Sequence, residues 1–400
     1  MIQTWSPRTA DEAAACVQQA MAADLPMELV SAGTRRSFGR PVDAAARLDL
    51  SALSGVVTYQ PEELILSVGP ATPMAEVAEL LAGRGQCLAF EPPDYGGLWG
   101  GKAGEGTIGG AMMTGRGGPR RLTAGGPRDH CLGVKGVNGF GQAFAAGGRV
   151  VKNVTGFDIT KLVTGSFGTL CVVTELTLKV LPAPPDAATL AVLDLSDEAA
   201  VRLMSRALGC AAQVSSAAHL PAGIASGFEG RAATLLRVEG VSPSVAARIG
   251  HLSQLFEDAG EQVLLDREAS QRLWRDIADV AYFAGEARPV WKLSVPPAMG
   301  ARIGARLTQD LAGRCFYDWG GGAIWLEVPE APDGHAAGVR QILAEVVGSD
   351  GHATLMRASP QVRASVPPFQ PLAPAVAALT ERVRRQFDPQ GLFNPGRMYA

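Results

Sequence analysis

Residues 31–39 read Ser-Ala-Gly-Thr-Arg-Arg-Ser-Phe-Gly and follow a predicted strand at Met27–Ser31. Glycine lets the backbone turn its N–H groups inward, while Thr34 and Ser37 add hydroxyl donors and the two arginines add positive charge. This combination suits a pyrophosphate. An ordinary surface turn can have the same composition, so the loop alone leaves a phosphate site and a plain turn both open.

A second glycine-rich segment, residues 104–109, reads Gly-Glu-Gly-Thr-Ile-Gly and matches the G-x-G-x-x-G pattern of dinucleotide-binding proteins. In a Rossmann fold this pattern follows a strand within a βαβ unit and opens a helix. Here it follows a glycine-rich loop with no such unit before it, which disfavours an NAD site. With Gly110 and the residues after it, the segment is better interpreted as a loop that lays its backbone against a flat ligand before a helix begins.

A third segment begins with Gly-Arg-Val-Val-Lys-Asn at residues 148–153 and contains Gly165 and Gly168 on either side of a sharp bend. Lys152 and Asn153 are polar residues between a valine-rich strand and a turn. Such residues either cap a strand or contact a ligand. Taken alone, a bend of this kind is more often structural, and contact with a ligand stays open.

Length and composition limit the class of protein. The 400 residues are enough for two or three domains with buried cores. The net charge is −3 and no block of like charge stands out, so nothing indicates a nucleic-acid partner. Apolar stretches fall short of the ~18 residues that span a bilayer, and the N-terminus lacks the apolar core of a signal peptide. We therefore expect a cytoplasmic protein that reaches a membrane, at its inner face, only through partners.

The cysteines and histidines predict no metal site. The six cysteines are dispersed without a C-x-x-C pair, and the five histidines are scattered. This pattern argues against an iron–sulfur cluster and a zinc finger within the chain. It also suits a reducing compartment.

The order of predicted elements indicates an α+β chain in three parts. Residues 1–182 combine short strands and helices with the glycine-rich loops. Prolines at 182, 184 and 185 form a stiff break. Residues 183–358 alternate strands and helices, as in a ferredoxin-like domain with helices on one face of a mostly antiparallel sheet. Residues 359–400 contain a helix at Ala375–Phe387 and a tail.

Two hairpins are predicted within these parts. The first spans Leu132–Phe144, where Asn138-Gly139 can take the positive φ values of a tight turn. The second lies between Trp319 and Trp325, on either side of three glycines, and its tryptophans fit a core better than an interface.

Seven stretches of the sequence carry a resemblance to a known family. They read SAGTRRSFGRP, LAFEPPD, GTIGGAMMTGRGGPRR, RDHCLGVKGVNGFGQ, GGRVVKNVTGFDITKLVTGSFGTLCVVTELTLKVLP, FYDWGGGAIWLE and FDPQGLFNPGRMY, and they extend from residue 31 to the C-terminal region. The chain resembles the vanillyl-alcohol-oxidase/PCMH superfamily of FAD-binding flavoproteins, and within it the E-type FAD-binding subunits of glycolate oxidase (glycolate dehydrogenase). GRVVKNVTGFD and the Pro-Gly-Arg-Met-Tyr ending are specific to this type.

The resemblance implies a fold and a cofactor. The fold would be a PCMH-type FAD-binding domain of two α/β subdomains, then a ferredoxin-like α+β cap, with the C-terminal tail returning to the FAD-binding domain. Family members hold the pyrophosphate with the first loop, the ribityl chain and ring with the second, and the ring and adenine side with the bend. The implied FAD-binding residues are Gly33, Thr34, Arg35, Arg36, Ser37, Pro93, Gly106, Thr107, Ile108, Gly109, Gly110, Asp129, Gly165, Gly168, Val173 and Thr174.

The sequence departs from the family at two points. Relatives often have Gly-Ser-Glu-Gly where this chain has Gly-Ser-Phe-Gly at residues 165–168, so a polar contact of that glutamate is lost. Members that bind FAD covalently use a histidine or cysteine in or near the first two loops, and the first loop has neither. His130 and Cys131 lie in a later loop. We therefore predict non-covalent FAD.

The resemblance also implies an activity and partners. This chain would be the FAD-binding subunit of a hetero-oligomeric glycolate oxidase, with a second FAD-containing subunit and an iron–sulfur subunit, and the assembly would oxidise glycolate to glyoxylate. Two alternatives are an autonomous FAD-dependent dehydrogenase of another hydroxy acid or sugar, and a non-catalytic scaffold with a flavin fold.

Oxidation of a 2-hydroxy acid at a flavin needs a base for the hydroxyl proton and a cation for the carboxylate. The histidines of this chain form no cluster that supplies these roles. Arg116, Arg121 and Lys152 are the candidates, because they place positive charge near the flavin to hold a carboxylate or to stabilise reduced flavin. A solvated basic face is the alternative interpretation.

Overall fold

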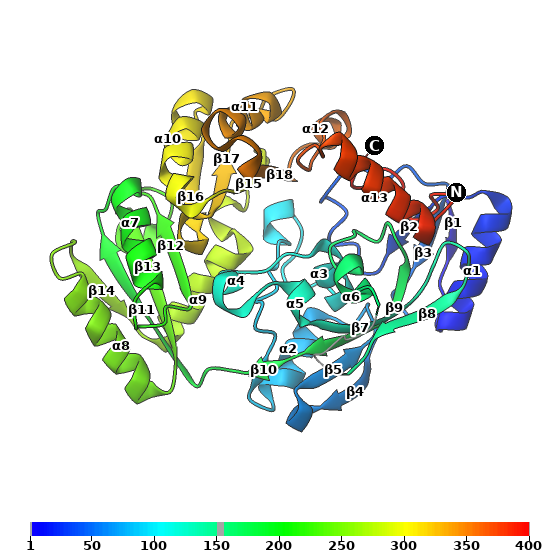
Figure 1. Cartoon of the computed structure of the whole chain (residues 1–400), viewed down its shortest axis with the longest axis horizontal. Coiled ribbons are helices and arrows are strands. Elements are labelled where there is room, and N and C mark those ends of the chain that lie inside the picture. Colours follow the sequence, from blue (N-terminus) through cyan, green and yellow to red (C-terminus); the bar gives the residue numbers. More distant parts are fainter. Residues whose placement is uncertain (1, 150–155, 400) are drawn as a thin grey trace.

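The computed structural model describes residues 2–149 and 156–399. It has two lobes, which Figure 1 shows side by side, with the C-terminal helices α12 and α13 beside the first lobe. We call the part from β1 to β10 the first lobe and the part from β11 to β18 the second lobe. None of the helices in the described ranges combines the length and the hydrophobicity that a bilayer-spanning segment requires.

The first lobe is built on two main sheets. A parallel three-stranded sheet has the order β1-β3-β2, and an antiparallel five-stranded sheet has the order β4-β5-β9-β7-β8. Its strands are β1 (Gln3–Trp5), β2 (Met27–Val30), β3 (Ala46–Asp49), β4 (Val56–Gln60), β5 (Ile65–Val68), β6 (Gln86–Cys87), β7 (Cys131–Val137), β8 (Ala143–Gly147), β9 (Val172–Lys179) and β10 (Leu181–Pro182). Its helices are α1 (Ala10–Ala23), α2 (Met74–Ala82), α3 (Ile108–Thr114), α4 (Arg121–Ala124), α5 (Pro127–His130) and α6 (Ile159–Val163).

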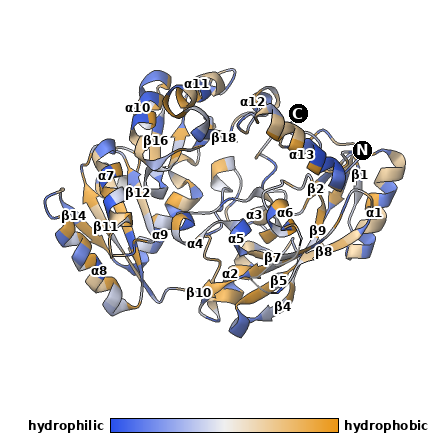
Figure 2. Ribbon diagram, in the orientation of Figure 1, coloured by the Kyte–Doolittle hydropathy of each residue, from blue (hydrophilic) through white to orange (hydrophobic). Residues whose placement is uncertain are grey.

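The core of the five-stranded sheet follows from the apolar side chains of its central strands. Leu66, Val134 and Leu176 come from β5, β7 and β9 and are buried in one cluster with α2 and α3. Figure 2 shows hydrophobic residues concentrated along these strands. Burying such side chains stabilises the fold by about 1.5–3 kcal/mol each. This sheet and the helices on it support the loops that form the site described below.

The second lobe consists of two ferredoxin-like units that share one sheet. The eight strands are antiparallel in the order β14-β11-β13-β12-β16-β17-β15-β18, and each half follows the chain order β-α-β-β-α-β. The strands are β11 (Asp186–Leu193), β12 (Ser216–Leu220), β13 (Ala233–Gly240), β14 (Gln262–Leu265), β15 (Val290–Ser294), β16 (Arg314–Asp318), β17 (Ala323–Glu327) and β18 (His352–Arg357). The helices are α7 (Asp197–Leu208), α8 (Ser242–Leu255), α9 (Arg267–Asp279), α10 (Gly300–Leu311) and α11 (Ala336–Val347).

Helix α9 corrects the prediction that all helices of this lobe lie on one face of the sheet. Helices α7, α8, α10 and α11 pack in clusters on one side. Helix α9 joins the two units, and its Trp274 and Ile277 pack instead with Phe38 and Tyr95 of the first lobe. The opposite face of the sheet is also apolar and must be buried. Helix α9 and the first lobe bury it together.

Two further local predictions differ from the structure. The hairpin between β7 and β8 forms, but its positive φ falls on Gly141, at +69°, rather than on Asn138-Gly139. The carbonyl oxygen of the Asn138 side chain accepts hydrogen bonds from the amides of Phe140 and Gln142, so the turn is longer than the predicted one. The sequence also predicts two strands, at residues 170–173 and 176–181, where the structure has one continuous strand, β9, followed by the two-residue strand β10.

The C-terminal segment returns to the first lobe, which confirms that part of the predicted fold. After α12 (Pro360–Ser365) and α13 (Pro374–Phe387), Phe393 forms a parallel bridge with Met27 of β2. The amide of Met27 donates to the carbonyl of Leu392, and the amide of Asn394 donates to the carbonyl of Met27. The tail therefore extends the three-stranded sheet beside residues 31–39. The predicted boundaries at residues 182 and 358 stay predictions.

Candidate cofactor-binding site

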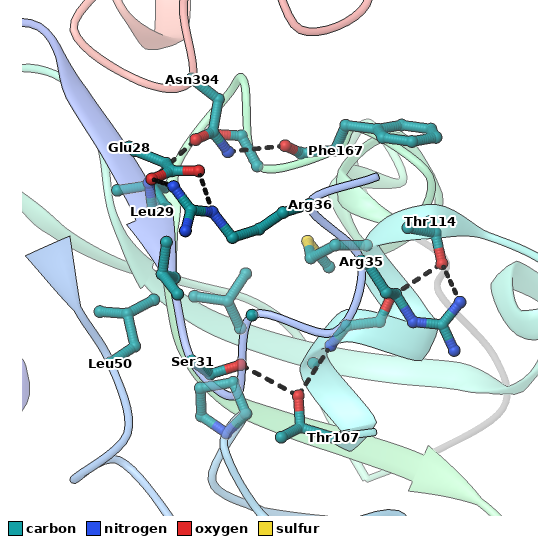
Figure 3. A pocket seen from close by; sticks show the side chains of 18 of the residues that line it. Glu28, Leu29, Ser31, Arg35, Arg36, Leu50, Thr107, Thr114, Phe167 and Asn394 are labelled. Atoms are coloured by element: carbon teal, nitrogen blue, oxygen red, sulfur yellow. Dashed lines mark hydrogen bonds and ion pairs between the residues drawn. The ribbon is translucent and has the colours of Figure 1, made fainter. Parts of the chain in front are cut away.

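An open pocket of about 840 Å³ lies in the first lobe beside the loop of residues 31–39. Figure 3 shows side chains from β2, the loop, α3, the 165–168 bend and the tail around it. These segments are distant in sequence and meet because the tail and the bend both pack on β2. The pocket is therefore formed by parts of the chain that only the fold brings together.

The backbone of the loop is arranged for an anion. Arg397 donates to the carbonyl of Arg35 at 2.7 Å, and Arg363 donates to the carbonyls of Arg36 and Gly39 at 3.3 and 3.1 Å. The carbonyl groups are therefore held by the C-terminal segment. In the described part of the chain, the amides of three consecutive pocket-lining residues, 33–35, have no hydrogen-bond partner. Free amides beside a positive φ at Gly33 are the elements of an anion-binding nest.

The two arginines of the loop have different surroundings. Arg36 forms two hydrogen bonds to the carboxylate of Glu28, at 2.7 and 2.6 Å, and its side chain is half exposed. Arg35 is partly buried and donates to Thr114 Oγ1 at 3.2 Å and to the carbonyl of Pro93 at 3.1 Å, while its Nε has no partner in the described residues. Burial lowers the pKa of Arg35 from its ordinary value. Glu28 neutralises Arg36, so Arg35 is the cation of the loop that a ligand would meet.

Helix α3 approaches the loop through small residues. Thr107 caps the helix by accepting a hydrogen bond from the amide of Gly110, and its hydroxyl lies 3.1 Å from that of Ser31. A Cβ at Gly109 would lie 2.6 Å from the carbonyl oxygen of Pro70, so only glycine fits there. This close contact lets the backbone of α3 form one wall of the pocket.

The bend at residues 165–168 forms another wall. Gly165, Phe167 and Gly168 all have positive φ, and a Cβ at Gly168 would lie 2.8 Å from Asn394 Nδ2. Asn394 donates to the carbonyl of Phe167 at 2.8 Å and accepts from the amide of Leu29 at 2.9 Å. Asn394 thus ties the bend to β2. Asn394 and Arg397 were not among the residues predicted for this site, although both lie in the Asn-Pro-Gly-Arg stretch of the tail.

The structure gathers part of the predicted set around the pocket. The predicted residues that line it are Gly33, Thr34, Arg35, Arg36, Thr107, Gly109, Gly110, Gly168 and Val173. The predicted residues outside this lining are Ser37, Pro93, Gly106, Ile108, Asp129, Gly165 and Thr174. Asp129 instead caps its own short helix, α5, by accepting a hydrogen bond from the amide of Gly126 at 2.8 Å. Ile108 is a core residue.

A second pocket lies between the lobes. It is lined by Gly115, Arg116, Gly117, Arg121, Lys292, Ser294, Trp319, His352 and Thr354 and encloses about 490 Å³. Two of the predicted catalytic candidates, Arg116 and Arg121, meet here, whereas Lys152 lies outside the described residues. Lys292 was not predicted as a site residue, although a lysine within the apolar strand β15 is unusual. In the described ranges, no three side chains of His, Cys, Asp or Glu gather as a metal site would require.

Comparison with known proteins agrees with this geometry. Residues 3–147 match the FAD binding domain family. The fold is similar to that of p-cresol methylhydroxylase with substrate bound, with a TM-score of 0.72, 13% identity, and coverage of 98% of this chain and 88% of that one. An alkyldihydroxyacetonephosphate synthase structure gives a TM-score of 0.69 at 13% identity and covers 98% of this chain and 76% of that one. The first lobe therefore contains an FAD binding domain, and the chain has the fold of p-cresol methylhydroxylase.

The sequence comparison narrows this class. The chain is 31% identical to the glycolate oxidase subunit GlcE of Escherichia coli (strain K12) over 389 residues, which is 96% of this chain and 95% of the relative. It therefore belongs to the family of that glycolate oxidase subunit, and its cofactor is FAD. The glycolate oxidase subunit GlcD of Bacillus subtilis (strain 168) is 29% identical over 201 residues, half of this chain and 41% of the relative.

Proposed function

We propose that this chain is the FAD-binding subunit of a hetero-oligomeric glycolate oxidase that oxidises glycolate to glyoxylate. The observation that carries the proposal is the shared length, since 95% of the Escherichia coli subunit aligns with this chain and includes both lobes. The flavin, when bound, accepts the hydride that leaves the carbon bearing the hydroxyl group.

The chain's own contribution begins with binding and orientation. The free amides of residues 33–35 and the Arg35 guanidinium would hold the pyrophosphate of FAD, while α3 and the bend would contact its ring system. Arg363 and Arg397 fix the loop from behind through its carbonyl groups, so the amides are in place before the cofactor binds.

We infer non-covalent binding of FAD. Among the described residues that line the pocket, Cys171 is the one with a side chain able to form a bond to flavin. Burial raises the pKa of its thiol to about 12, so the thiolate is not available at neutral pH. Unfolding the protein should release all the flavin into the supernatant.

The partners follow from the family. A second FAD-containing subunit and an iron–sulfur subunit would complete the assembly, with electrons passing from flavin to the iron–sulfur subunit. The similarity of this chain to the glycolate oxidase subunit GlcD of Bacillus subtilis supports a pair of related flavin subunits. We place the chain in the cytoplasm, with any membrane contact at the inner face and made by the partners.

The flavin content of purified variants tests the cofactor site. Gly109→Ala forces a methyl group against the carbonyl of Pro70 and should lower the flavin-to-protein ratio severalfold, whereas Gly250→Ala on α8 of the second lobe, whose methyl group meets no atom within 4 Å, is the matched control. Arg35→Ala should lower the ratio more than Arg36→Ala, because Glu28 already neutralises Arg36. Equal flavin content in all four variants would remove the loop and α3 from the site.

Reduction of the flavin tests the activity. Glycolate should bleach the flavin absorbance of the complex purified with its two partners. Bleaching of the isolated chain by another hydroxy acid or a sugar, with no response of the complex to glycolate, would favour an autonomous dehydrogenase. A complex that keeps full glycolate oxidation without flavin in this chain would favour the scaffold interpretation.

A further inference from the structure

We propose that the second pocket, between the lobes, binds the carboxylate of a small 2-hydroxy or 2-keto acid through Lys292, Arg116 and Arg121. This inference rests on the proposed function for its substrate class, but it assigns a ligand site to this chain itself rather than to a partner subunit. It is carried by three observations: positive charge without a counter-ion, an arrangement of groups suited to a hydroxy acid, and contact with the cofactor site.

The charge of this pocket is not neutralised. Lys292 is 5% exposed and lies on β15, among apolar residues. Over the residues that the structure describes, Lys292, Arg116 and Arg121 form no ion pair and no side-chain hydrogen bond, and Arg116 Nε is buried without a partner. Uncompensated charge in a protein interior is costly and persists where a function requires it.

One carboxylate lies nearby but does not balance the three cations. Asp318 precedes Trp319 and accepts a hydrogen bond from the backbone amide of Trp319 at 2.7 Å. Burial raises the pKa of Asp318 to about 7, although Lys292 acts in the opposite direction. Asp318 is therefore only partly ionised near neutral pH, and the pocket keeps an excess of positive charge.

Trp319 holds two of the cations in position. The Lys292 ammonium lies 3.8 Å from the centroid of its ring, and the Arg121 guanidinium lies 5.3 Å from it. The indole N–H donates to the carbonyl of Gly118 at 3.1 Å, which joins the second lobe to the first. Trp319 has a φ of +54°, a strained conformation for a bulky residue, and such strain is concentrated at functional sites.

The remaining lining residues suit a hydroxy acid. Ser294 and Thr354 bring two hydroxyl groups to the same pocket, and His352 brings an imidazole. Cations bind the carboxylate, while hydroxyl groups and an imidazole exchange hydrogen bonds with an alcohol or a ketone. A site that binds phosphate alone does not require these hydroxyl and imidazole groups.

The pocket adjoins the cofactor site along the backbone. Helix α3 ends at Thr114, which lines the cofactor pocket, and the next residue, Gly115, lines the second pocket. A Cβ at Gly115 would lie 3.0 Å from Gly165 Cα, so the end of α3 packs directly on the bend. An anion held by Arg116 therefore lies beside the wall that the two pockets share.

Anion binding should be linked to proton uptake. Burial and then Arg116 hold the pKa of Lys292 well below its ordinary value, and an anion would raise it again. The other titratable or charged groups that face the cluster are Asp318 and His352, Tyr95 beside Arg116, and Glu91 and Arg237 beside Asp318. Protonation of Asp318 and of His352 also adds positive charge as the pH falls. All three changes have the same sign, so the affinity for a carboxylate should increase from pH 9 to pH 6.

Titration of the full-length, FAD-loaded chain with oxalate tests the proposal. Oxalate is a carboxylate that cannot be oxidised as an alcohol, and its binding is measured by calorimetry and by tryptophan fluorescence, to which Trp319 at the pocket contributes with five other tryptophans. Lys292→Met and Arg121→Met should each weaken binding at least tenfold, whereas Lys135→Met, at an exposed lysine paired with Glu175, should leave it unchanged. Calorimetry in buffers of different ionisation enthalpy should show proton uptake at pH 8.

Two results would overturn the inference. One is oxalate binding that is equal in wild type, Lys292→Met and Arg121→Met. The other is inorganic phosphate binding as tightly as oxalate, which would indicate a general anion site. Loss of FAD from the purified wild-type chain would instead count against the proposed function, so the two failures are distinguishable.

Discussion

Arg120 and Arg121 are consecutive residues at the start of helix α4, yet their electrostatic surroundings are opposite. Arg120 donates from Nε to Glu239 at 2.9 Å and from Nη2 to the same carboxylate, and it lies 3.4 Å from Glu91. Arg121 has no carboxylate partner in the described residues and lies over the Trp319 ring. The first arginine is placed for stability, and the second is placed for a ligand.

The surroundings of Arg120 form a neutral cluster between the lobes. Arg237 of β13 donates to both carboxylate oxygens of Glu91, at 2.8 and 2.9 Å, so two arginines and two glutamates alternate. We call Glu91, Arg120, Arg237 and Glu239 the lobe-linking cluster. The second pocket lies at the same junction and has cations alone. The arginines of the lobe-linking cluster are paired with carboxylates, whereas the cations of the second pocket are not, although both groups lie between the lobes.

The largest effect is expected from removing the central arginine of the cluster. Arg120→Ala leaves two glutamates largely buried with one cation and should lower the free energy of unfolding by about 3–5 kcal/mol. Arg121→Ala, the adjacent control, should change it by less than about 1 kcal/mol. Urea unfolding at pH 7 measures both. Similar losses in the two variants would contradict the distinction between the two arginines.

A smaller, pH-dependent loss is expected for Glu239→Gln. Burial opposes ionisation of Glu239, but Arg237 and Arg120 prevail and hold its pKa below the ordinary value. The resulting stability is present above the unfolded pKa of about 4.3 and disappears as the pH falls through the folded pKa. The difference in unfolding free energy between wild type and Glu239→Gln should therefore be about 2 kcal/mol at pH 7 and shrink below pH 4. A difference that is constant with pH would show that the carboxylate charge contributes nothing.

Oxalate should stabilise the protein through the second pocket and not through the lobe-linking cluster. Oxalate at ten times its dissociation constant should raise the unfolding free energy of the wild type by about 1.4 kcal/mol. At the same concentration Lys292→Met should show little increase, whereas Glu239→Gln should show the full increase from its lower baseline. Thermal unfolding with and without oxalate provides the measurement. A full increase in Lys292→Met would move the oxalate site elsewhere.

The smallest effect is expected for Lys292→Met without ligand. Methionine has a similar volume and removes a buried, unpaired amino group whose pKa is lowered by burial, so the variant should unfold within about 0.5 kcal/mol of the wild type or be more stable. The benefit should vanish above the ordinary pKa of lysine, where the unfolded side chain is also neutral. A loss of several kcal/mol in urea unfolding would mean that Lys292 stabilises the fold like Arg120.

The sequence predicted well what local patterns determine. The sequence predicts helices at residues 74–82 and 197–208, and α2 and α7 have these bounds, because a cap or a proline begins each and an apolar stripe continues through it. Helix α9 was not predicted from the sequence. It buries just three residues, Ser270, Trp274 and Ile277, which are too few to form a recognisable apolar stripe. The doubling of the ferredoxin-like unit depends on strand pairing across long sequence separations, which no local pattern specifies.

The candidate sites show the same limit. The loop at residues 31–39 was recognisable because its glycines, hydroxyls and arginines are contiguous. The role of Arg36 could not be recognised from the sequence, because its partner Glu28 lies on the preceding strand. The second pocket combines Arg116, Lys292 and Trp319, which are brought together only when the lobes pack.

The most direct test of the account is the flavin absorbance spectrum of the full-length chain during titration with oxalate. If the second pocket adjoins the flavin, oxalate should perturb the flavin bands with the same dissociation constant that tryptophan fluorescence gives. Lys292→Met should keep its flavin and show no perturbation at that concentration. Oxalate that quenches tryptophan fluorescence while the flavin bands stay unchanged would contradict the account, because the two pockets would then be separate.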